Sequence, residues 1–289
     1  MSIDIDHLRS WIGRQESNKD TITPFPVAAL AATLDRDDPE PRPGDALPPL
    51  WHWLYFLPIA RHSELAEDGH LQRGGFLPPV PLPRRMFAGA RMQFLKPLRI
   101  GEAIKRKSTI ADVSMKEGRS GPLIFVTVRH DISGPAGIAL TEEHDIVYRD
   151  EPARLGMTPP GHAAPTGAAW MREIHADPVM LFRYSALIFI AHRIHYDWRY
   201  VTEVEGYPGL LVHGPLIATL LADLFRRHSA APLQSFGFRA VSPLFDAAPF
   251  SVCGRPESET RVSLWAQNSL GELAMKAEAV TNPGSAGAR

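Results

Sequence analysis

The chain has 289 residues and a nearly balanced charge, 31 Lys and Arg against 32 Asp and Glu, which excludes the strongly basic face that binding to nucleic acid or to an anionic membrane requires. Its single cysteine excludes an internal disulfide framework, and neither a secretory signal nor a membrane span of roughly 20 apolar residues is present. We therefore expect a cytoplasmic protein of two domains, since about 100 to 150 residues is a common domain size.

The first part of the chain predicts one clear helix and much irregular structure. Residues 8–19 are polar and favour at most a short amphipathic helix, whereas the small-residue run 27–35 follows a proline and favours a buried helix. Residues 36–50 are rich in Pro and Asp and are typical of a loop. The aromatic segment 51–56 favours a strand or a packed ledge, and the Gly and Pro content of residues 66–85 predicts irregular structure.

The pattern changes at Met86, after which short segments of alternating apolar residues predict strands. Glycine-containing turns separate three of these segments and predict an antiparallel meander: residues 103–115, 123–132 and 140–148. Residues 151–167 are rich in proline and are typical of a linker. We therefore divide the chain into an N-terminal domain, residues 1–150, and a C-terminal domain, residues 168–289.

The second domain repeats the order of elements of the first, an apolar helix followed by strands. An apolar segment that begins at Pro215 predicts a buried helix, and four strands should follow it: residues 233–242, 249–254, 260–267 and 270–281. Each half thus has one apolar helix and several strands. A helix that lies across the concave face of a curved antiparallel sheet buries both apolar surfaces. The sequence therefore predicts an α+β fold made of two such units.

Titratable residues are concentrated shortly before the helix of the second domain. The apolar run 183–191 ends in the sequence HRIHYD, residues 192–197, at the edge of a buried region where burial can tune pKa values. The helix at Pro215 would point its N-terminal N–H groups at whatever lies near His195. We therefore expect chemistry at this corner of the molecule.

Two stretches carry a family resemblance. Residues 182–197, followed by LVHGP at 211–215, resemble the C-terminal domain of the MaoC-like enoyl-thioester hydratases and dehydratases, in the type 2 3-hydroxyacyl-thioester dehydratase branch, and residues 83–101 are similar to the N-terminal domain of that branch. The branch includes hydratases of mesaconyl and itaconyl thioesters. The resemblance implies a tandem (double) hot-dog fold, each unit an antiparallel sheet around a central helix. It also implies an acyl-CoA substrate, with coenzyme A as part of the substrate and no metal or other cofactor.

The resemblance further implies that only the C-terminal unit carries the catalytic motif. In the wider family the catalytic loop has an Asp, or an Asn in this branch, followed after four intervening residues by a His. Matching this loop to the chain places His195 at the histidine position and Ile190 at the polar position. Because Ile can neither orient water nor accept a proton, the usual partner of the catalytic histidine is missing.

Hydration of an α,β-unsaturated thioester needs a base that activates water, an acid that protonates the α-carbon, and donors for the thioester oxygen. His195 can serve as the acid–base because imidazole titrates near neutral pH, and a structural histidine is the alternative. Gly214 is the candidate backbone donor, since only glycine lets a carbonyl approach the main chain so closely, or it merely opens the helix. Asp197 can stabilise the imidazolium or cap a turn.

Further residues are candidates for substrate binding or support. His213 is expected to hold the loop. Arg193 can pair with a substrate carboxylate in bidentate fashion, or form a salt bridge between the domains. Arg84 and Arg85 can meet the phosphates of coenzyme A, or be ordinary surface arginines. Cys253 is expected to be a buried structural thiol, since no base is arranged beside it.

The leading hypothesis is a hydro-lyase that adds water to, or removes it from, a short enoyl- or 3-hydroxyacyl-CoA, with a dicarboxylic acyl group such as itaconyl or mesaconyl as the most specific expectation. A hot-dog thioesterase would instead direct water at the carbonyl carbon and release the thiol. A third hypothesis, supported by Ile190, is a protein that binds acyl thioesters without turnover. The sequence has no motif for a metal, a dinucleotide or a serine nucleophile, and a homodimer is compatible with the fold.

Overall fold

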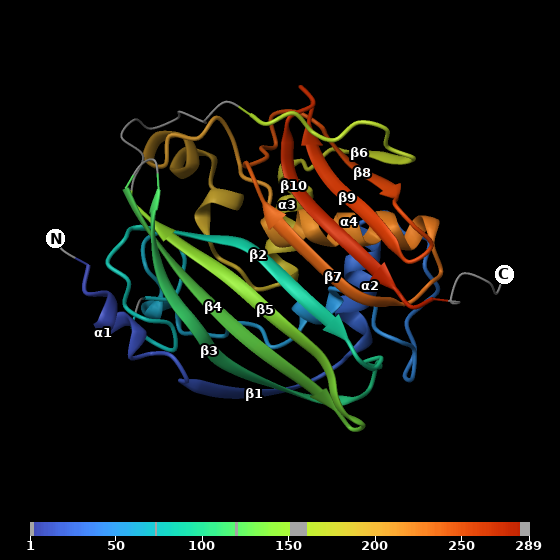
Figure 1. Ribbon diagram of the computed structural model, residues 1–289, viewed down its shortest axis with the longest axis horizontal. Helices are drawn as coiled ribbons and strands as arrows, with labels where there is room; N and C mark the ends of the chain where they lie inside the picture. The colour runs from blue at the N-terminus through green and yellow to red at the C-terminus, as the bar shows by residue number, and fades with distance from the viewer. Residues whose placement is uncertain (1–2, 73, 119–120, 151–160, 284–289) are drawn as a thin grey trace.

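One continuous antiparallel sheet organises the molecule. The computed structural model describes residues 3–72, 74–118, 121–150 and 161–283. Within them the strands follow the order β1-β3-β4-β5-β2-β7-β10-β9-β8-β6 (Figure 1), and every neighbouring pair is antiparallel. The two halves of the sequence therefore occupy the two ends of the same sheet.

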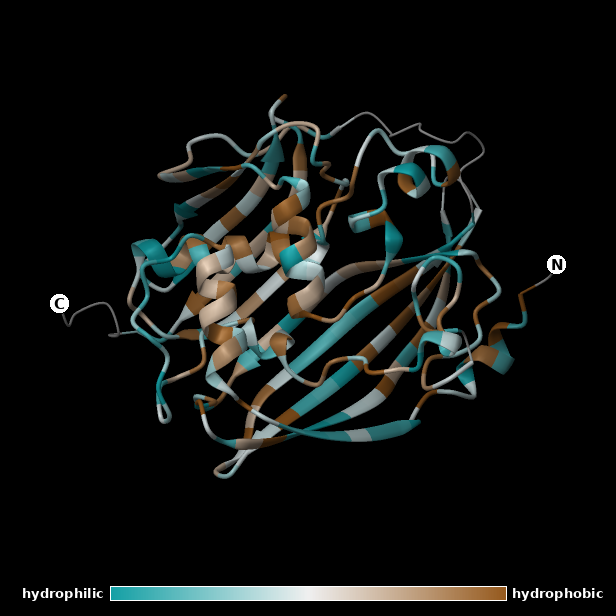
Figure 2. Ribbon diagram, turned by 180° about the vertical axis from the view of Figure 1, so that it is seen from behind, coloured by the Kyte–Doolittle hydropathy of each residue, from teal (hydrophilic) through white to brown (hydrophobic). Residues whose placement is uncertain are grey.

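The N-terminal half supplies the first block of strands: β1 (Gln15–Thr21), β2 (Arg84–Phe94), β3 (Ala103–Gly118), β4 (Gly121–Gly134) and β5 (Gly137–Arg149). The antiparallel meander predicted over β3 to β5 is confirmed. Gly137 opens β5 directly after the turn and has a φ of +94°, a conformation that favours glycine. Apolar and polar residues alternate along these strands (Figure 2), so one face of the block is buried.

The C-terminal half supplies the second block: β6 (Trp170–Ile174), β7 (Leu233–Ala240), β8 (Phe250–Pro256), β9 (Arg261–Asn268) and β10 (Leu273–Thr281). The four strands predicted after the second helix are confirmed. The blocks join where β2 pairs with β7, from Gly89 opposite Arg239 to Gln93 opposite Ser235. Backbone hydrogen bonds thus run across the boundary between the halves.

Four α-helices lie among the described residues: α1 (Ile5–Arg9), α2 (Pro24–Thr33), α3 (Pro178–Leu187) and α4 (Gly214–His228). The helices predicted over residues 27–35 and from Pro215 correspond to α2 and α4. Ten consecutive residues of α4, 216–225, are buried, because the helix lies against β6, β8, β9 and β10 on one side of the sheet (Figures 1 and 2). No helix in the described ranges is long and apolar enough to cross a membrane.

One local prediction was wrong, and a second held only in its alternative form. Part of the segment 8–19 forms β1, an edge strand that pairs with β3 through its backbone, so its side chains did not need an apolar pattern. The aromatic segment at 51 forms a short 3-10 turn, Trp51–Leu54, rather than a strand. The packed ledge is nevertheless present, because Trp51 and Leu54 are almost fully buried.

The larger of two hydrophobic clusters spans both halves. It contains Leu30, Trp51 and Met92 from the N-terminal half together with Leu216 and Phe236 from the C-terminal half, each at most 1% exposed. A smaller cluster lies under the far end of the N-terminal block. Because burial of apolar area is the main favourable term in folding, this shared core ties the halves together.

A buried carboxylate adds a polar connection between the halves. The fully buried side chain of Asp223, on α4, accepts hydrogen bonds from Arg36 at 2.5 Å, Arg227 at 2.7 Å and Arg172 at 3.2 Å. Arg36 follows α2, so this cluster fixes the C-terminal turns of α4 to the N-terminal half. Three charged donors around one carboxylate offset the cost of burying it.

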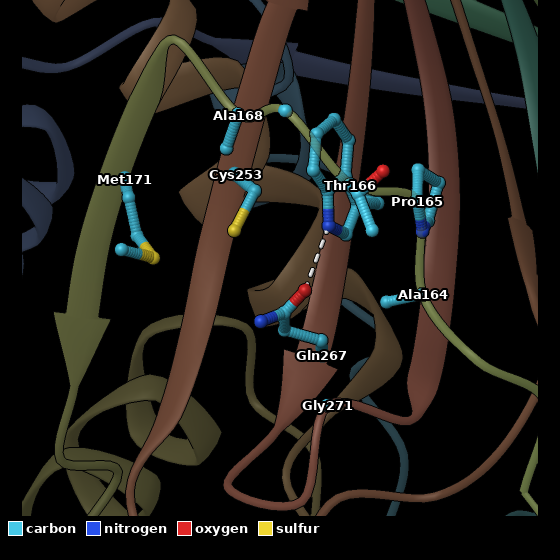
Figure 3. A pocket seen from close by; sticks show the side chains of 10 residues that line it. Ala164, Pro165, Thr166, Ala168, Met171, Cys253, Gln267 and Gly271 are labelled. Carbon is cyan, nitrogen blue, oxygen red and sulfur yellow. Dashed lines mark hydrogen bonds between the residues drawn. The ribbon is translucent and has the colours of Figure 1, made fainter.

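The segment predicted as a linker, 151–167, is described only from residue 161 onward, and the predicted domain boundary stays a prediction. Its described part crosses over β8 and β9 (Figure 3), and Ala163 bridges to Glu272 in the turn between β9 and β10. A cavity of about 260 Å³ lies beneath it, lined in part by Cys253. Cys253 is buried, and burial raises the pKa of its thiol to about 11, as expected of a structural thiol.

Candidate active site

The loop between α3 and α4 holds the histidine that the sequence singled out. The chain leaves α3 at Leu187, turns at Phe189, whose φ is +51°, and passes through the short 3-10 turn Arg193–His195. The Nδ1 atom of His195 lies 2.8 Å from the carbonyl oxygen of Leu211. A carbonyl can only accept, so in the neutral ring Nδ1 carries the proton and Nε2 is the basic nitrogen.

Burial lowers the pKa of His195 to about 4, although the hydrogen bond to Leu211 opposes this shift. The imidazole is therefore neutral at neutral pH. A neutral imidazole with a fixed tautomer can accept a proton from water through Nε2 and can return it. The geometry supports the acid–base role predicted for His195.

His213 supports His195 through ring stacking. The two rings stack with centroids 3.6 Å apart and planes 19° apart, and Nε2 of His213 lies 2.8 Å from the hydroxyl of Ser185. Burial, followed by the charges of His195 and His192, holds the pKa of His213 well below its usual range. These contacts fit the predicted role of holding the loop, and Ser185 is a supporting residue that no sequence pattern singled out.

Gly214 is the first residue of α4, and His213 occupies the N-cap position without capping the helix by its side chain. A Cβ atom built on Gly214 would meet nothing within 4 Å, so packing does not demand a glycine here. Open space at the Cβ position of Gly214, at a helix N-terminus that no side chain caps, leaves room for an approaching oxygen, which the positive end of the helix dipole favours. Because His195 stacks on the residue before Gly214, the base lies beside this helix end.

Asp197 and Arg193 bind each other. The carboxylate of Asp197 accepts from Arg193 at 2.8 and 3.0 Å and from the backbone N–H of Tyr200 at 3.0 Å. First the Tyr200 amide and then Arg193 lower the pKa of Asp197. The predicted turn-capping role of Asp197 is thus present, whereas its predicted contact with the His195 imidazolium is not among the described interactions.

The two N-terminal arginines are placed differently. Arg84 is half-buried, forms an ion pair with Glu205 at 3.0 Å and donates to the hydroxyl of Tyr207 at 2.9 Å, so it links β2 to the C-terminal half. Arg85 is also half-buried, and its charge, after burial and the charges of His70 and His195, contributes to the lowered pKa of His192. Of the predicted substrate-binding arginines, Arg85 is the one without a carboxylate partner among the described residues.

Ile190 takes the place of the usual polar partner and packs against the hydrophobic core. Three polar residues gather on the other side of the loop: Asp68, His70 and His192. Their ligand-type atoms lie within 4.8 Å of one another, so among the residues that the structure describes this set, two imidazoles and one carboxylate, is the one that could hold a divalent metal ion. Sequence reasoning missed Asp68 and His70, because more than 100 residues separate them from the loop they contact.

Comparison with solved structures identifies the fold. A MaoC-like dehydratase superposes with a TM-score of 0.72 at 14% identity, covering 94% of this chain and 98% of that one. HtdX of Mycobacterium tuberculosis gives a TM-score of 0.64 at 17% identity over 93% and 100%. A second M. tuberculosis protein, described as having a double hot-dog fold, gives 0.57 at 12% identity over 96% and 98%. The predicted tandem hot-dog, α+β fold is confirmed.

Sequence comparison identifies the family. The chain is 50% identical over 268 residues to the mesaconyl-C(4)-CoA hydratase of Chloroflexus aurantiacus, covering 93% of this chain and 95% of that protein. It is 28% identical to the mitochondrial hydroxyacyl-thioester dehydratase type 2 of Schizosaccharomyces pombe, over 81% and 88%. The family model of hydroxyacyl-thioester dehydratase type 2 matches residues 50–246. The chain therefore belongs to the hydroxyacyl-thioester dehydratase type 2 family and is a hydro-lyase of acyl thioesters.

Proposed function

We propose that this hydro-lyase adds water across the C2=C3 double bond of a short enoyl-CoA that carries a free carboxylate, of the mesaconyl class, and catalyses the reverse dehydration. The observation that carries the proposal is the placement of the basic Nε2 of His195, fixed through Leu211, beside the uncapped N-terminus of α4. The acyl group is inferred from the 50% identity to a mesaconyl-C(4)-CoA hydratase. An itaconyl thioester is the second substrate of this class to test.

The residues present account for each step of the reaction. Nε2 of His195 takes a proton from water while the water oxygen bonds to C3, and the π electrons move onto the thioester oxygen. The N–H of Gly214, at the positive end of α4, stabilises that developing negative charge. His195 then returns the proton to C2, so that one water is added and the thioester bond stays intact.

Arg85 is the proposed binder of the substrate's anionic group. Arg193 and Arg84 are already paired with Asp197 and Glu205, whereas the charge of Arg85 reaches the active-site loop at His192. A guanidinium binds a carboxylate in bidentate fashion. We therefore expect Arg85 to bind the free carboxylate of the acyl group.

The test follows the enoyl-thioester absorbance band with crotonyl-, mesaconyl- and itaconyl-CoA, and measures free thiol in parallel. Loss of the band without thiol release, abolished in His195→Ala, is the expected result. Thiol release would favour the thioesterase hypothesis. Tight binding without turnover of any substrate would favour the binding-protein hypothesis, with Ile190 as its reason.

The carboxylate assignment has its own matched pair of variants. Arg85→Gln should raise KM for mesaconyl-CoA by about tenfold or more, because a charge-assisted contact is worth roughly 1.5–3 kcal/mol, while crotonyl-CoA, which lacks the carboxylate, is affected less. Arg91→Gln is the control, since Arg91 lies on the same strand but pairs with Glu143 and Asp145 at the surface. Equal effects of Arg85→Gln on both substrates would contradict the assignment.

We also propose a cytoplasmic location and the pairing of two copies. Fractionation of the native host and light scattering during size-exclusion chromatography test them separately. A particle of one chain mass would contradict the homodimer.

A further inference from the structure

The helices α2 and α3 form an outer layer of the molecule. Each follows the first strand of its half, β1 and β6 respectively, and each has a proline in its first turn. The two helices pack against each other, and Figure 2 shows them in front of α4, on the side away from the sheet. Each helix therefore packs one side inward and presents the opposite side to solvent.

The outward side of α3 is apolar. Val179 and Phe182 are each 63% exposed, and Phe189, in the turn after the helix, is 54% exposed. Ala186 is exposed as well. Val179, Phe182 and Ala186 are three and four residues apart, a spacing that places them on one side of a helix. The inward side has its own buried residues, such as Leu181, so α3 is apolar on both sides.

The outward side of α2 has the same spacing. Phe25 is 75% exposed, and Ala28 and Ala32 are the exposed residues of the following turns. The helix α2 contains no charged residue, and α3 contains only Arg183. A helix that is apolar on all sides is ordinarily buried. We call these exposed apolar residues together the outer helix face: Phe25, Ala28, Ala32, Val179, Phe182, Ala186 and Phe189.

The area of the outer helix face fits the centre of a protein interface. An aromatic side chain has roughly 150–250 Å² of surface, so at their exposed fractions the three phenylalanines alone present roughly 400 Å². Single exposed apolar residues are ordinary, whereas a patch of this size on two packed helices marks an interaction site. A specific dimer buries roughly 800 Å² per partner, with an apolar centre and a polar rim. The outer helix face supplies such a centre.

The outer helix face suits contact with a second copy of itself. Its bulky residues Phe25 and Phe182 lie one helical turn from the small residues Ala28 and Ala186. A twofold axis brings the same surface of both copies together, so the phenylalanines of one copy can pack over the alanines of the other, as ridges into grooves. Like charges would also meet across such an axis, but Arg183 is the one charged residue of the two helices.

We propose that the outer helix face is the surface through which two copies of this chain form a symmetric dimer. The inference rests on the pairing of two copies proposed above, goes further by naming the face, and is independent of the hydration chemistry. Phe189 belongs to the face and, with a φ of +51°, turns the chain into the loop that carries His195. The partner would thus cover the entry to the catalytic loop.

Light scattering during size-exclusion chromatography tests the face with charge variants. The native chain should have twice the chain mass. Phe25→Glu and Phe182→Glu should each raise the Kd of the dimer about 100-fold or more, because each would bury two unpaired like charges at the contact. Circular dichroism checks that these exposed substitutions leave the chain folded. Leu270→Glu is the matched control, since Leu270 is 81% exposed but lies in the turn between β9 and β10, and it should stay dimeric.

A charge-pairing experiment separates loss of contact from general damage. One chain carries Phe25→Glu with Phe182→Glu, and a second chain, with an affinity tag, carries Phe25→Lys with Phe182→Lys. Each chain alone should be monomeric. An equimolar mixture should form a heterodimer, because opposite charges then meet whichever of these residues face each other across the axis. A mixture that stays at one chain mass overturns the inference.

The remaining outcomes are distinguishable. A native particle of one chain mass overturns this inference together with the pairing of two copies, and a native dimer that both Glu variants leave intact overturns only the face. A native monomer that binds phosphatidylcholine vesicles, and loses this binding in Phe25→Glu and Phe182→Glu, would assign the face to a lipid surface instead. Hydration of acyl-CoA is measured separately, so none of these results bears on the proposed reaction.

Discussion

The acid limb of the hydratase pH profile tests the electrostatics of the site. Burial lowers the pKa of His195 from its ordinary 6.5 to about 4. At pH 5.5 an ordinary imidazole would be only about one-tenth neutral, whereas a histidine that titrates near 4 stays almost entirely neutral. The buried base should therefore keep about tenfold more of its active form at pH 5.5 than an exposed histidine would.

The direction of the pH effect on kcat/KM follows from the lowered pKa of His195. The active form of His195 is the neutral one, so kcat/KM should stay flat from pH 8 down to about 5 and fall tenfold per pH unit below about 4. Neither His192 nor His213 should add a limb within this range, because burial, and then His70 and His195, lower the pKa of His192 to about 2, and burial holds that of His213 well below its usual range.

The assay is initial-rate hydration of crotonyl-CoA at substrate concentrations well below KM, since kcat/KM reports the free enzyme. Samples held at each acidic pH and then returned to pH 7 must regain full activity, which separates titration of His195 from unfolding. An inflection of kcat/KM near 6.5 in reversibly folded protein would refute the argument that burial sets the state of this base.

Three further outcomes are expected. Gly69→Ala should lower kcat/KM about 100-fold, because its Cβ would lie 1.8 Å from a backbone oxygen of the catalytic loop, whereas Gly74→Ala, also at positive φ but in open space, should be near native. Asp223→Ala should lower the free energy of unfolding in urea by about 3 kcal/mol or more, since it leaves three arginines without their buried carboxylate. Cys253 should resist iodoacetamide at pH 8 in native protein, because its thiol is buried and titrates near 11; rapid labelling would show that the cavity beneath residues 161–167 opens.

Local patterns predicted the elements that bury apolar side chains. The helix α4 and the meander β3 to β5 have strong periodicity, because each packs one or more faces into the core. His195, His213 and Gly214 could be selected together because they lie within 20 residues, on either side of one turn and at the start of one helix. The family resemblance then supplied the roles that spacing alone could not.

Features that depend on backbone pairing or on distant contacts could not be predicted. The strand β1 is polar because it lies at the sheet edge, where only its backbone is required. Asp68 and His70 lie at the active site because the backbone at Gly69 closely approaches that of Ala191. Nothing in the sequence near residue 69 predicts which loop it contacts. Arg84 likewise looked like a phosphate ligand until its pairing with Glu205 was visible.

The pairing of β2 with β7 has an evolutionary consequence. In a symmetric dimer of two identical hot-dog subunits, every substitution appears twice, so a loop that improves one active site is also imposed on the other. Here both units lie in one chain and share one sheet, which allows each to diverge separately. One unit could keep the histidine and the helix end while the other accumulated its own supporting contacts, such as the ion pair from Arg84 to Glu205.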